Sequence, residues 1–168
     1  MFTHKNLFTG LKQTTNTMVN QIIKGRDLML FNPSGNSFAW ATSHSLNINA
    51  ETADISSKDH GIWGGSEVTK FSWEITSENL YTEDGYNQMF DYMLAGVPIT
   101  VRFGLKSQND NSKNVADGDY DNWTSKTTGY YTGPVVITSL QANANNGENA
   151  TYSVTLTGAG KIVRHTQA

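Results

Sequence analysis

The stretch ETADISSKDHGIW, Glu51 to Trp63, concentrates the side chains of this sequence that could do chemistry. Its charged and hydroxyl residues are Glu51, Asp54, Ser56, Ser57, Lys58 and Asp59, with His60 as a possible further charge. Such a set could belong to an active-site loop, a metal-binding loop or a surface that meets another protein. The preceding segment SFAWATSHSLNINA alternates like a strand, so we expect Glu51 to Trp63 to be a loop that leaves a sheet.

A second acidic segment, DGDYDN, is the best metal candidate. Asp117, Asp119 and Asp121 alternate as the first ligands of a calcium loop would. The rest of that pattern is missing, because the glycine is misplaced and Thr128 stands where a bidentate Glu is needed. A solvated loop rich in Asx turns is the favoured interpretation.

The histidines and serines do not indicate an enzyme. The four histidines, His4, His44, His60 and His165, form no H-x-H or H-E-x-x-H pair, and the chain has no cysteine. Ser43 is next to His44, but neighbouring strand residues point to opposite faces and cannot form a triad hydrogen bond. A glycosidase pair of carboxylates cannot be recognised from sequence, since it depends on a separation in space. We expect no catalytic residues, no metal and no cofactor.

Aromatic side chains leave a binding function open. A sugar-stacking platform on a β-sandwich could be built from Trp40, Trp63, Trp73, Trp123, Tyr130 and Tyr131. Trp40 and Trp73 alternate with core positions and are expected to be buried, whereas Trp63 and Trp123 are expected in loops. Anchoring of those loops is the favoured role, and a glycan-binding module is the alternative function.

Composition narrows the remaining classes. The 168 residues suit one domain, and 15 glycines against 3 prolines fit a turn-rich β protein. The net charge of −3 without a Lys/Arg cluster argues against binding to nucleic acid through phosphate contacts. No apolar run is long enough for a spanning helix, and the N-terminal segment lacks the apolar centre of a signal peptide, so we expect no membrane association.

Alternating segments predict a mainly antiparallel β fold with one buried face. A hairpin is expected where DLMLF and SFAWATSH flank the turn NPSGN, and GPVVITSLQAN is expected to be a strand with Pro134 near its start. The predicted core positions are Phe71, Trp73 and Ile75; Val97, Ile99, Val101 and Phe103; and Ala150, Tyr152, Val154 and Leu156.

One segment, YTEDGYNQMFDYMLAG, has helical periodicity instead. We expect a helix with Thr82 as N-cap and Gly96 at its C-terminal end. Its apolar stripe, which should face the sheet, consists of Tyr86, Met89, Phe90, Met93 and Leu94.

The domain organisation follows from these patterns. Residues 1–24 lack sustained periodicity and are expected to be an N-terminal arm, while residues 25–168 form a single β domain. Residues 106–129 are expected to be a long polar loop. The wet face of the sheet is rich in Thr, Ser and Asn, and its edges show no Lys or Pro guards. Such a sheet favours self-association.

The serial order of these motifs resembles the major tail protein family of long-tailed phages, whose members are tail tube subunits. The resemblance rests on SHSL followed by AETADISSKDHGIW, on FDYMLAGVPITVRFG and on NGENATYSVTLTG, and it covers most of Gly25 to Ile162. It implies a two-sheet β-sandwich or barrel flanked by one helix, in a protein of the phage virion that is made in the host cytoplasm.

The resemblance also implies partners. Subunits of this family form rings, expected to be hexamers, that stack into a hollow tube around a tape-measure protein and end at a tail-terminator protein. DNA is then expected to pass through the lumen without specific binding. In this context the loop from Glu51 to Trp63 is expected to contact a neighbouring subunit. Its interface candidates are Glu51, Asp54, Ser56, Ser57, Lys58, Asp59 and Trp63.

Overall fold

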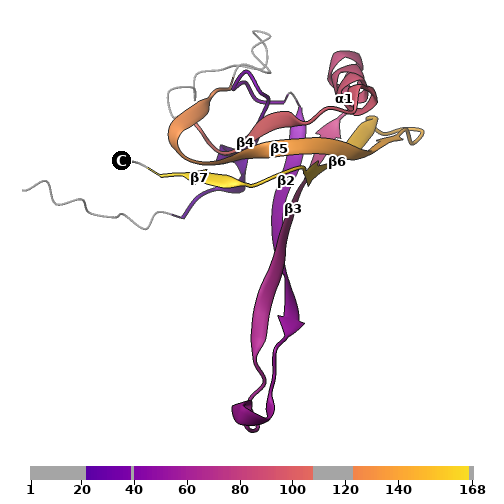
Figure 1. The fold of residues 1–168 in the computed structure, drawn as a ribbon. Coiled ribbons are helices and arrows are strands. Elements are labelled where there is room, and N and C mark those ends of the chain that lie inside the picture. The colour runs from indigo at the N-terminus through magenta and orange to yellow at the C-terminus, as the bar shows by residue number, and fades with distance from the viewer. Residues whose placement is uncertain (1–21, 39, 108–122, 167–168) are drawn as a thin grey trace, which may run out of the picture.

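The structure, a computed structural model, describes residues 22–38, 40–107 and 123–166 (Figure 1). The predicted class is confirmed, because strands dominate these residues and a single α-helix accompanies them. The elements are η1 (Gly25–Asp27), β1 (Leu28–Phe31), β2 (Ala41–Asp54), η2 (Lys58–His60), β3 (Ser66–Leu80), α1 (Glu83–Ala95), β4 (Ile99–Lys106), β5 (Ser125–Asn143), β6 (Thr151–Gly158) and β7 (Val163–His165).

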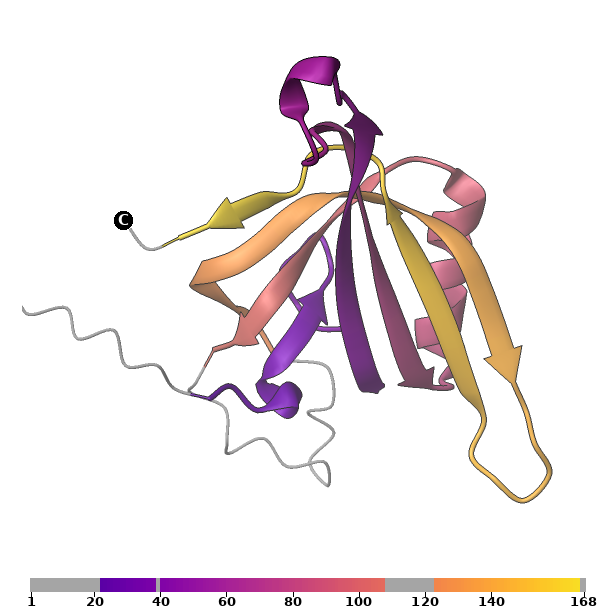
Figure 2. The ribbon, with the colours of Figure 1, turned by 90° about the horizontal axis from the view of Figure 1, so that it is seen from below.

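All the strands of the described residues belong to one antiparallel sheet with the order β1-β4-β5-β6-β3-β2, and β7 pairs with β5. Figure 2 shows that this sheet curls into a half-barrel. The sandwich or barrel expected from the sequence is therefore built from one continuous sheet. The curl brings side chains of both halves together over a common core.

The core lies on the concave face of the sheet. Alternate residues of β3, β4, β5 and β6 are buried there, and the pair Ile75 and Leu156 joins β3 to β6 at its centre. Full burial of such side chains contributes about 1.5–3 kcal/mol each. The buried hydrophobic residues are Leu30, Phe31, Phe38, Trp73, Ile75, Met89, Val101, Phe103, Val135, Ile137, Tyr152, Val154 and Leu156.

Two of the predicted core positions are exposed, and two more, Ile99 and Ala150, are only half-buried. Phe71 is 72% exposed because it lies on the part of β3 before Glu74, where the pairing of β3 with β6 begins. Val97 is 59% exposed because it precedes β4 instead of belonging to it. The period-2 pattern identifies one face of a strand, but it does not say where along the strand that face is covered.

The hairpin predicted around the turn NPSGN is only partly right, because the antiparallel pairing is limited to the residues next to the turn. β1 pairs with β4 and β2 pairs with β3, so these two segments share only an isolated bridge between Phe31 and Ser37. Trp40 interrupts the expected strand with a positive φ of 62°, a conformation that non-glycine residues rarely adopt. The Trp40 carbonyl accepts a hydrogen bond from the Leu80 N–H, so the turn at Trp40 places the start of β2 beside the end of β3.

Helix α1 begins and ends as predicted. The Thr82 hydroxyl accepts a hydrogen bond from the Gly85 N–H, and Gly96 has the left-handed conformation at the C-terminal end. The predicted buried stripe is only partly right. Met89 is buried, and Tyr86 packs against the core beside the Tyr152 ring.

The other stripe residues do not face the sheet. In the described structure Phe90 is 44% exposed, Met93 is 38% exposed and Leu94 is 71% exposed. The predicted apolar stripe is wider than the strip of helix surface that contacts the sheet. One side of the stripe is therefore buried, and the other side is left uncovered. These three residues form an apolar surface that the sequence assigned to the core.

Strand β5 is longer than predicted. It begins at Ser125, so residues 125–129 belong to the sheet and not to the polar loop, and Pro134 lies inside the strand. The Pro134 carbonyl accepts a hydrogen bond from the Ala159 N–H, between the residues of β5 that pair with β6 and those that pair with β7. Proline is tolerated here because the N–H that it lacks would point to this same side of β5, where the ladder is interrupted, and not to β4. Most of the predicted N-terminal arm, residues 1–21, lies outside the described residues. So does most of the predicted polar loop, residues 108–122.

Candidate subunit interface

The hairpin of β2 and β3 projects far beyond the rest of the sheet (Figure 1). We call residues 49–72 the projecting arm, because Trp73 is 5% exposed while Phe71, two residues earlier, is 72% exposed. Residues 49–54 alone extend about 20 Å at the usual rise of a strand. Glu51 and Asp54 therefore lie in a strand, which corrects the prediction that the whole stretch from Glu51 is a loop.

The tip of the arm is ordered by its own hydrogen bonds. Ser57 caps the short helix η2, since its hydroxyl accepts from the Asp59 N–H at 3.3 Å. The His60 ring returns the contact, with its Nδ1 accepting from the Ser57 N–H at 3.0 Å. The Ser56 hydroxyl accepts from the Gly65 N–H at 2.9 Å and closes the turn. The two predicted hydroxyls thus hold the shape of the tip.

The predicted charges line the arm and its tip. Glu51 forms an exposed ion pair with Lys70 at 3.7 Å. The Ser56 hydroxyl and then the Ser56 N–H stabilise the Asp54 carboxylate and lower the pKa of Asp54 below its usual value. Lys58 and Asp59 are exposed and have no ion pair with any other residue that the structure describes. Their charges are available to a second molecule.

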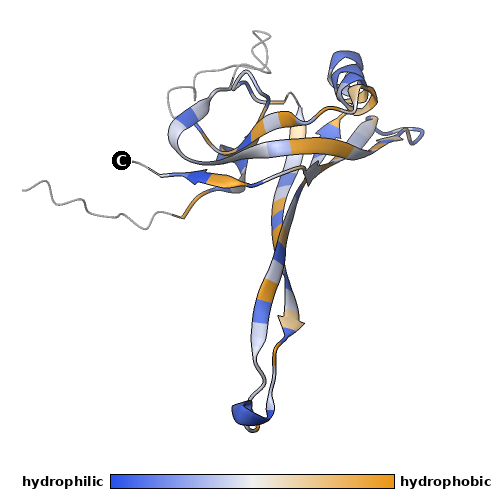
Figure 3. Ribbon diagram, viewed as in Figure 1, coloured by the Kyte–Doolittle hydropathy of each residue, from blue (hydrophilic) through white to orange (hydrophobic). Residues whose placement is uncertain are grey.

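An apolar stripe continues from the core onto the arm. The paired residues Ile48 and Trp73 lie at the edge of the core, and the next pair on the same face contains the exposed Phe71. At the tip, Trp63 is 79% exposed and Ile62 is 94% exposed. Figure 3 shows this alternation of hydrophobic and hydrophilic residues along the arm. Exposed apolar surface on this scale is typical of protein contacts.

Of these apolar residues, sequence reasoning selected only Trp63 as an interface candidate. The missed residues on the arm and at its base are Ile48, Ile55, Ile62, Val68 and Phe71, and those on or after α1 are Phe90, Met93, Leu94 and Val97. A signal for the first group exists in the pairing segments themselves. β2 and β3 are 14 and 15 residues long, whereas β4 and β6 are 8 residues long each. Part of the β2-β3 hairpin is therefore longer than the strands beside it, and its apolar residues have no neighbouring strand to pack with.

The convex face of β2, β3, β6 and β5 is polar and smooth. Its hydroxyls bond to each other across strands, as Thr138 does with Thr157 at 2.8 Å. Glu74 and Glu78 are its charged residues, and residues 41–48, 73–80, 136–143 and 151–158 contain no Lys or Arg. The face is thus hydrophilic without being basic.

Two edges of the same strands are open. β2 is the last strand of the sheet and pairs only with β3. Residues 136–143 of β5 pair with β6 on one side, and no other described strand pairs with their second side. Ala41–Ala50 of β2 carries no Lys, Arg, Asp, Glu or Pro that would discourage another strand from pairing with it.

The metal and catalytic candidates are not brought together. Asp117, Asp119 and Asp121 lie outside the described residues, and the described residues hold no cluster of three metal-ligating side chains. Both nitrogens of His44 are buried and lack a hydrogen-bond partner among the described residues, so Ser43 does not form a hydrogen bond with them. Burial lowers the pKa of His44 to about 4.

The aromatic candidates are dispersed. Trp73 is buried, Trp40 is half-buried, and Trp63 is at the tip of the arm. Tyr130 stacks on the His165 ring with centroids 4.5 Å apart, and Trp123 lies under the Lys106 ammonium at 3.9 Å. These rings do not form one stacking platform within the described structure.

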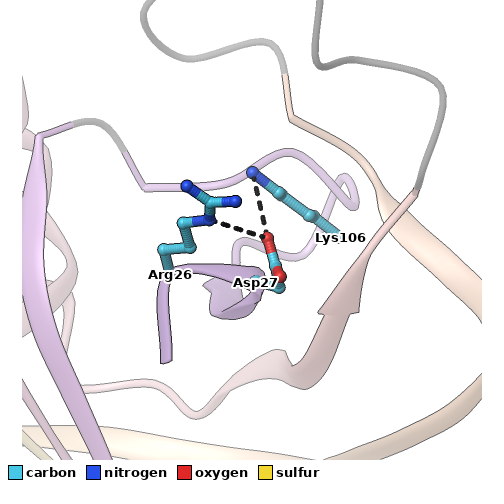
Figure 4. Close-up of polar contacts among 3 residues, drawn as sticks. All are labelled: Arg26, Asp27 and Lys106. Carbon is cyan, nitrogen blue, oxygen red and sulfur yellow. Dashed lines mark ion pairs between the residues drawn. The ribbon is translucent and has the colours of Figure 1, made fainter. Parts of the chain in front are cut away.

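The start of the sheet is fixed by a small charge cluster (Figure 4). The Asp27 carboxylate lies 3.5 Å from the Lys106 ammonium and 3.9 Å from the Arg26 guanidinium. Lys106 is largely covered, so its contact joins η1 to the end of β4. This cluster attaches the segment that follows the predicted N-terminal arm to the body of the protein.

The comparisons with known proteins agree with this picture. The sequence profile of the phage tail tube protein family matches residues 24–164. The chain belongs to this family. It is therefore a tail tube subunit and a component of the virion. No curated protein sequence matches the chain. The described chain has no helix with the length and hydrophobicity of a membrane span.

Solved tail structures share the fold of this tail tube protein. The tail of an empty gene transfer agent particle with C6 symmetry has a TM-score of 0.64 at 19% identity, over 86% of this chain and all of that chain. A chain from the virion of a native gene transfer agent particle has a TM-score of 0.64 at 18% identity, over 87% of this chain and all of that chain. The SPP1 tail tube gives 0.61 at 10% identity, over 87% and 80% of the two chains.

Proposed function

We propose that this tail tube protein forms hexameric rings that stack into a tube, and that the tube conducts DNA. The observation that carries the proposal is the sheet β2-β3-β6-β5, which has a polar convex face and two open edges. The open edge of β2 in one subunit joins the open edge of β5 in the next. The C6 symmetry of a similar tail supports six subunits.

The direction of the strands allows this ring to close. β5, β6, β3 and β2 alternate in direction because every pair is antiparallel. β2 therefore runs opposite to β5, and rotation about a common axis places it antiparallel to β5 of the neighbour. Because each subunit contributes an even number of alternating strands, every junction around the ring is antiparallel, like the pairs within a subunit. The ring thereby removes both exposed edges.

The polar convex face becomes the wall of the lumen in this arrangement. Hydroxyl and amide side chains keep the wall hydrated, and the carboxylates Glu74 and Glu78 repel phosphates. Without cations on these strands, DNA releases no counterions on contact and can slide. The subunit then acts as a wall and not as a catalyst. A tape-measure protein would fill the lumen before DNA, and a tail-terminator protein would close the last ring.

Within this assembly, residues 25–168 are the building block and residues 1–24 are an appended arm. The charged residues of the projecting arm, from Glu51 to Asp59, serve contacts between subunits. Their exposure in the single chain supports this role. Charge pairs at such contacts set register and specificity more than affinity.

Proline substitutions at the open edge test the ring. Asn47 and Ile48 are adjacent in β2 and pair with Glu74 and Trp73 of β3, so the N–H of one points to β3 and that of the other to the open edge. Asn47→Pro and Ile48→Pro should therefore differ. The variant that melts close to wild type has lost only the N–H at the open edge, and we expect it to stay monomeric in light scattering and to show no rings by negative-stain microscopy. Rings of normal abundance from that variant would contradict the edge-to-edge junction.

A further inference from the structure

The projecting arm and the outer side of α1 are two exposed apolar surfaces on one chain. On the arm they are Val68 and Phe71 with Ile62 and Trp63 at the tip, and beside α1 they are Phe90, Met93, Leu94 and Val97. We call the second group the helix patch. From these surfaces we infer that the arm of one subunit packs on the helix patch of another copy.

The positions of the two surfaces exclude a contact within one chain. The arm leaves the body on one side, and α1 lies on the opposite side (Figure 1). A surface at one end that fits a different surface at the other end forms a heterologous contact, and such contacts repeat without limit along an axis. The contact therefore suits the stacking of successive rings. This inference rests on the proposed tube.

The chemistry of the two surfaces is complementary. Phe90 and Leu94 are one helical turn apart and present a continuous apolar surface. Trp63 is a large, 79% exposed aromatic on a tip that hydrogen bonds have already ordered, so little conformational entropy is lost when it is buried.

Charge complements the apolar match. α1 contains Glu83, Asp84 and Asp91 and no Lys or Arg, and no ion pair joins these carboxylates to another described residue. Asp91 is adjacent to Phe90 and three residues before Leu94, so it borders the helix patch. Lys58 at the tip is likewise without an ion pair among the described residues. Lys58 can therefore pair with a carboxylate beside the helix patch, while its neighbour Asp59, also without an ion pair among the described residues, has to point away from the patch.

Disulfide trapping between two differently substituted chains tests the contact, because the natural chain has no cysteine. One chain carries Ile62→Cys at the tip of the arm or Val68→Cys in the β3 strand of the arm, and the other carries Met93→Cys. Phe90, Leu94 and Trp63 remain in place. A disulfide requires Cα atoms within about 7 Å, so a cross-link reports direct packing. As control, Met93→Cys is replaced by Asn145→Cys in the exposed turn between β5 and β6.

We expect oxidation of mixed assemblies to trap the Met93→Cys chain with at least one of the two arm variants, and not to trap the Asn145→Cys chain. Tubes that form without a cross-link to Met93→Cys from either arm position would overturn the inference while leaving the tube intact. If the unsubstituted protein forms neither rings nor tubes, the proposed function itself fails.

A single substitution gives an independent readout. Leu94→Asp should raise the concentration needed for tube growth by about tenfold or more, because it places a charge in an apolar contact. The melting temperature of the free subunit should not change, since Leu94 is 71% exposed. Gln88→Glu adds the same charge at an exposed position on another side of α1 and should leave growth unchanged. Tube growth at the wild-type concentration by Leu94→Asp, as expected if another protein covers the patch, would overturn the inference.

Discussion

The indole Nε1 of Trp73 donates a hydrogen bond to the Gly160 carbonyl at 2.7 Å, across 87 positions of sequence. The indole lies directly against Gly158, where an added Cβ would be 2.3 Å from its nitrogen. It also lies against Gly133, where an added Cβ would be 2.6 Å from the ring. Trp73 therefore joins β3, β5 and the segment after β6 at the point where the arm leaves the body.

Gly158→Ala is expected to destabilise the subunit by about 1–3 kcal/mol, because the buried indole cannot move away from the new methyl group without disturbing the core. The measurement is chemical unfolding of the free subunit. Gly25→Ala is the matched control, since nothing lies within 4 Å of its added Cβ. Equal stability of the two variants would show that the packing at Trp73 is looser than described.

Met89→Ala and Phe90→Ala should differ although the residues are adjacent. Met89 is 2% exposed, so its truncation should cost about 2–5 kcal/mol of unfolding free energy. Phe90 is 44% exposed, and its truncation should cost clearly less in the free subunit. A larger loss for Phe90→Ala than for Met89→Ala in denaturant melts would reverse our assignment of the two sides of α1.

Acid should destabilise the free subunit through His44. Burial lowers the pKa of His44 from 6.5 to about 4, so between these values the unfolded chain binds a proton that the folded chain does not. Stability from this residue is complete above pH 6.5 and decreases as the pH falls to about 4, by roughly 3 kcal/mol in total. His44→Phe should flatten this part of the stability profile. An unchanged slope between pH 6.5 and 4, relative to the value at pH 8, would contradict the burial of the imidazole.

The double reversal Lys58→Glu with Asp59→Lys should leave the melting temperature of the free subunit nearly unchanged. Exposed charges at the tip contribute about 0–1 kcal/mol each to folding. The same change should abolish or strongly slow tube formation, because like charges at a subunit contact cost several kcal/mol at every copy. Turbidity and microscopy follow assembly. Tubes that grow at the wild-type rate and with the wild-type salt dependence would remove these charges from the interface.

Local patterns determined much of this protein. The alternation of Tyr152, Val154 and Leu156 identified a strand and its buried face, because side chains of a strand point to opposite faces in turn. Thr82 and Gly96 fixed the ends of α1 through hydrogen bonding and backbone conformation within one turn of the helix. The order of the motifs identified the family, and the polar character of the sheet indicated self-association.

The tertiary structure decided which of these faces are covered. Phe71 and Trp73 have the same alternation, yet only Trp73 has glycines of other strands beneath it. Met89 and Phe90 belong to one apolar stripe, yet the sheet reaches only Met89. β1 does not pair with β2, the next strand in sequence, but with β4, where Leu28 lies opposite Leu105. Burial depends on which distant segments lie opposite a residue, and that pairing is a property of the whole sheet and not of any local spacing.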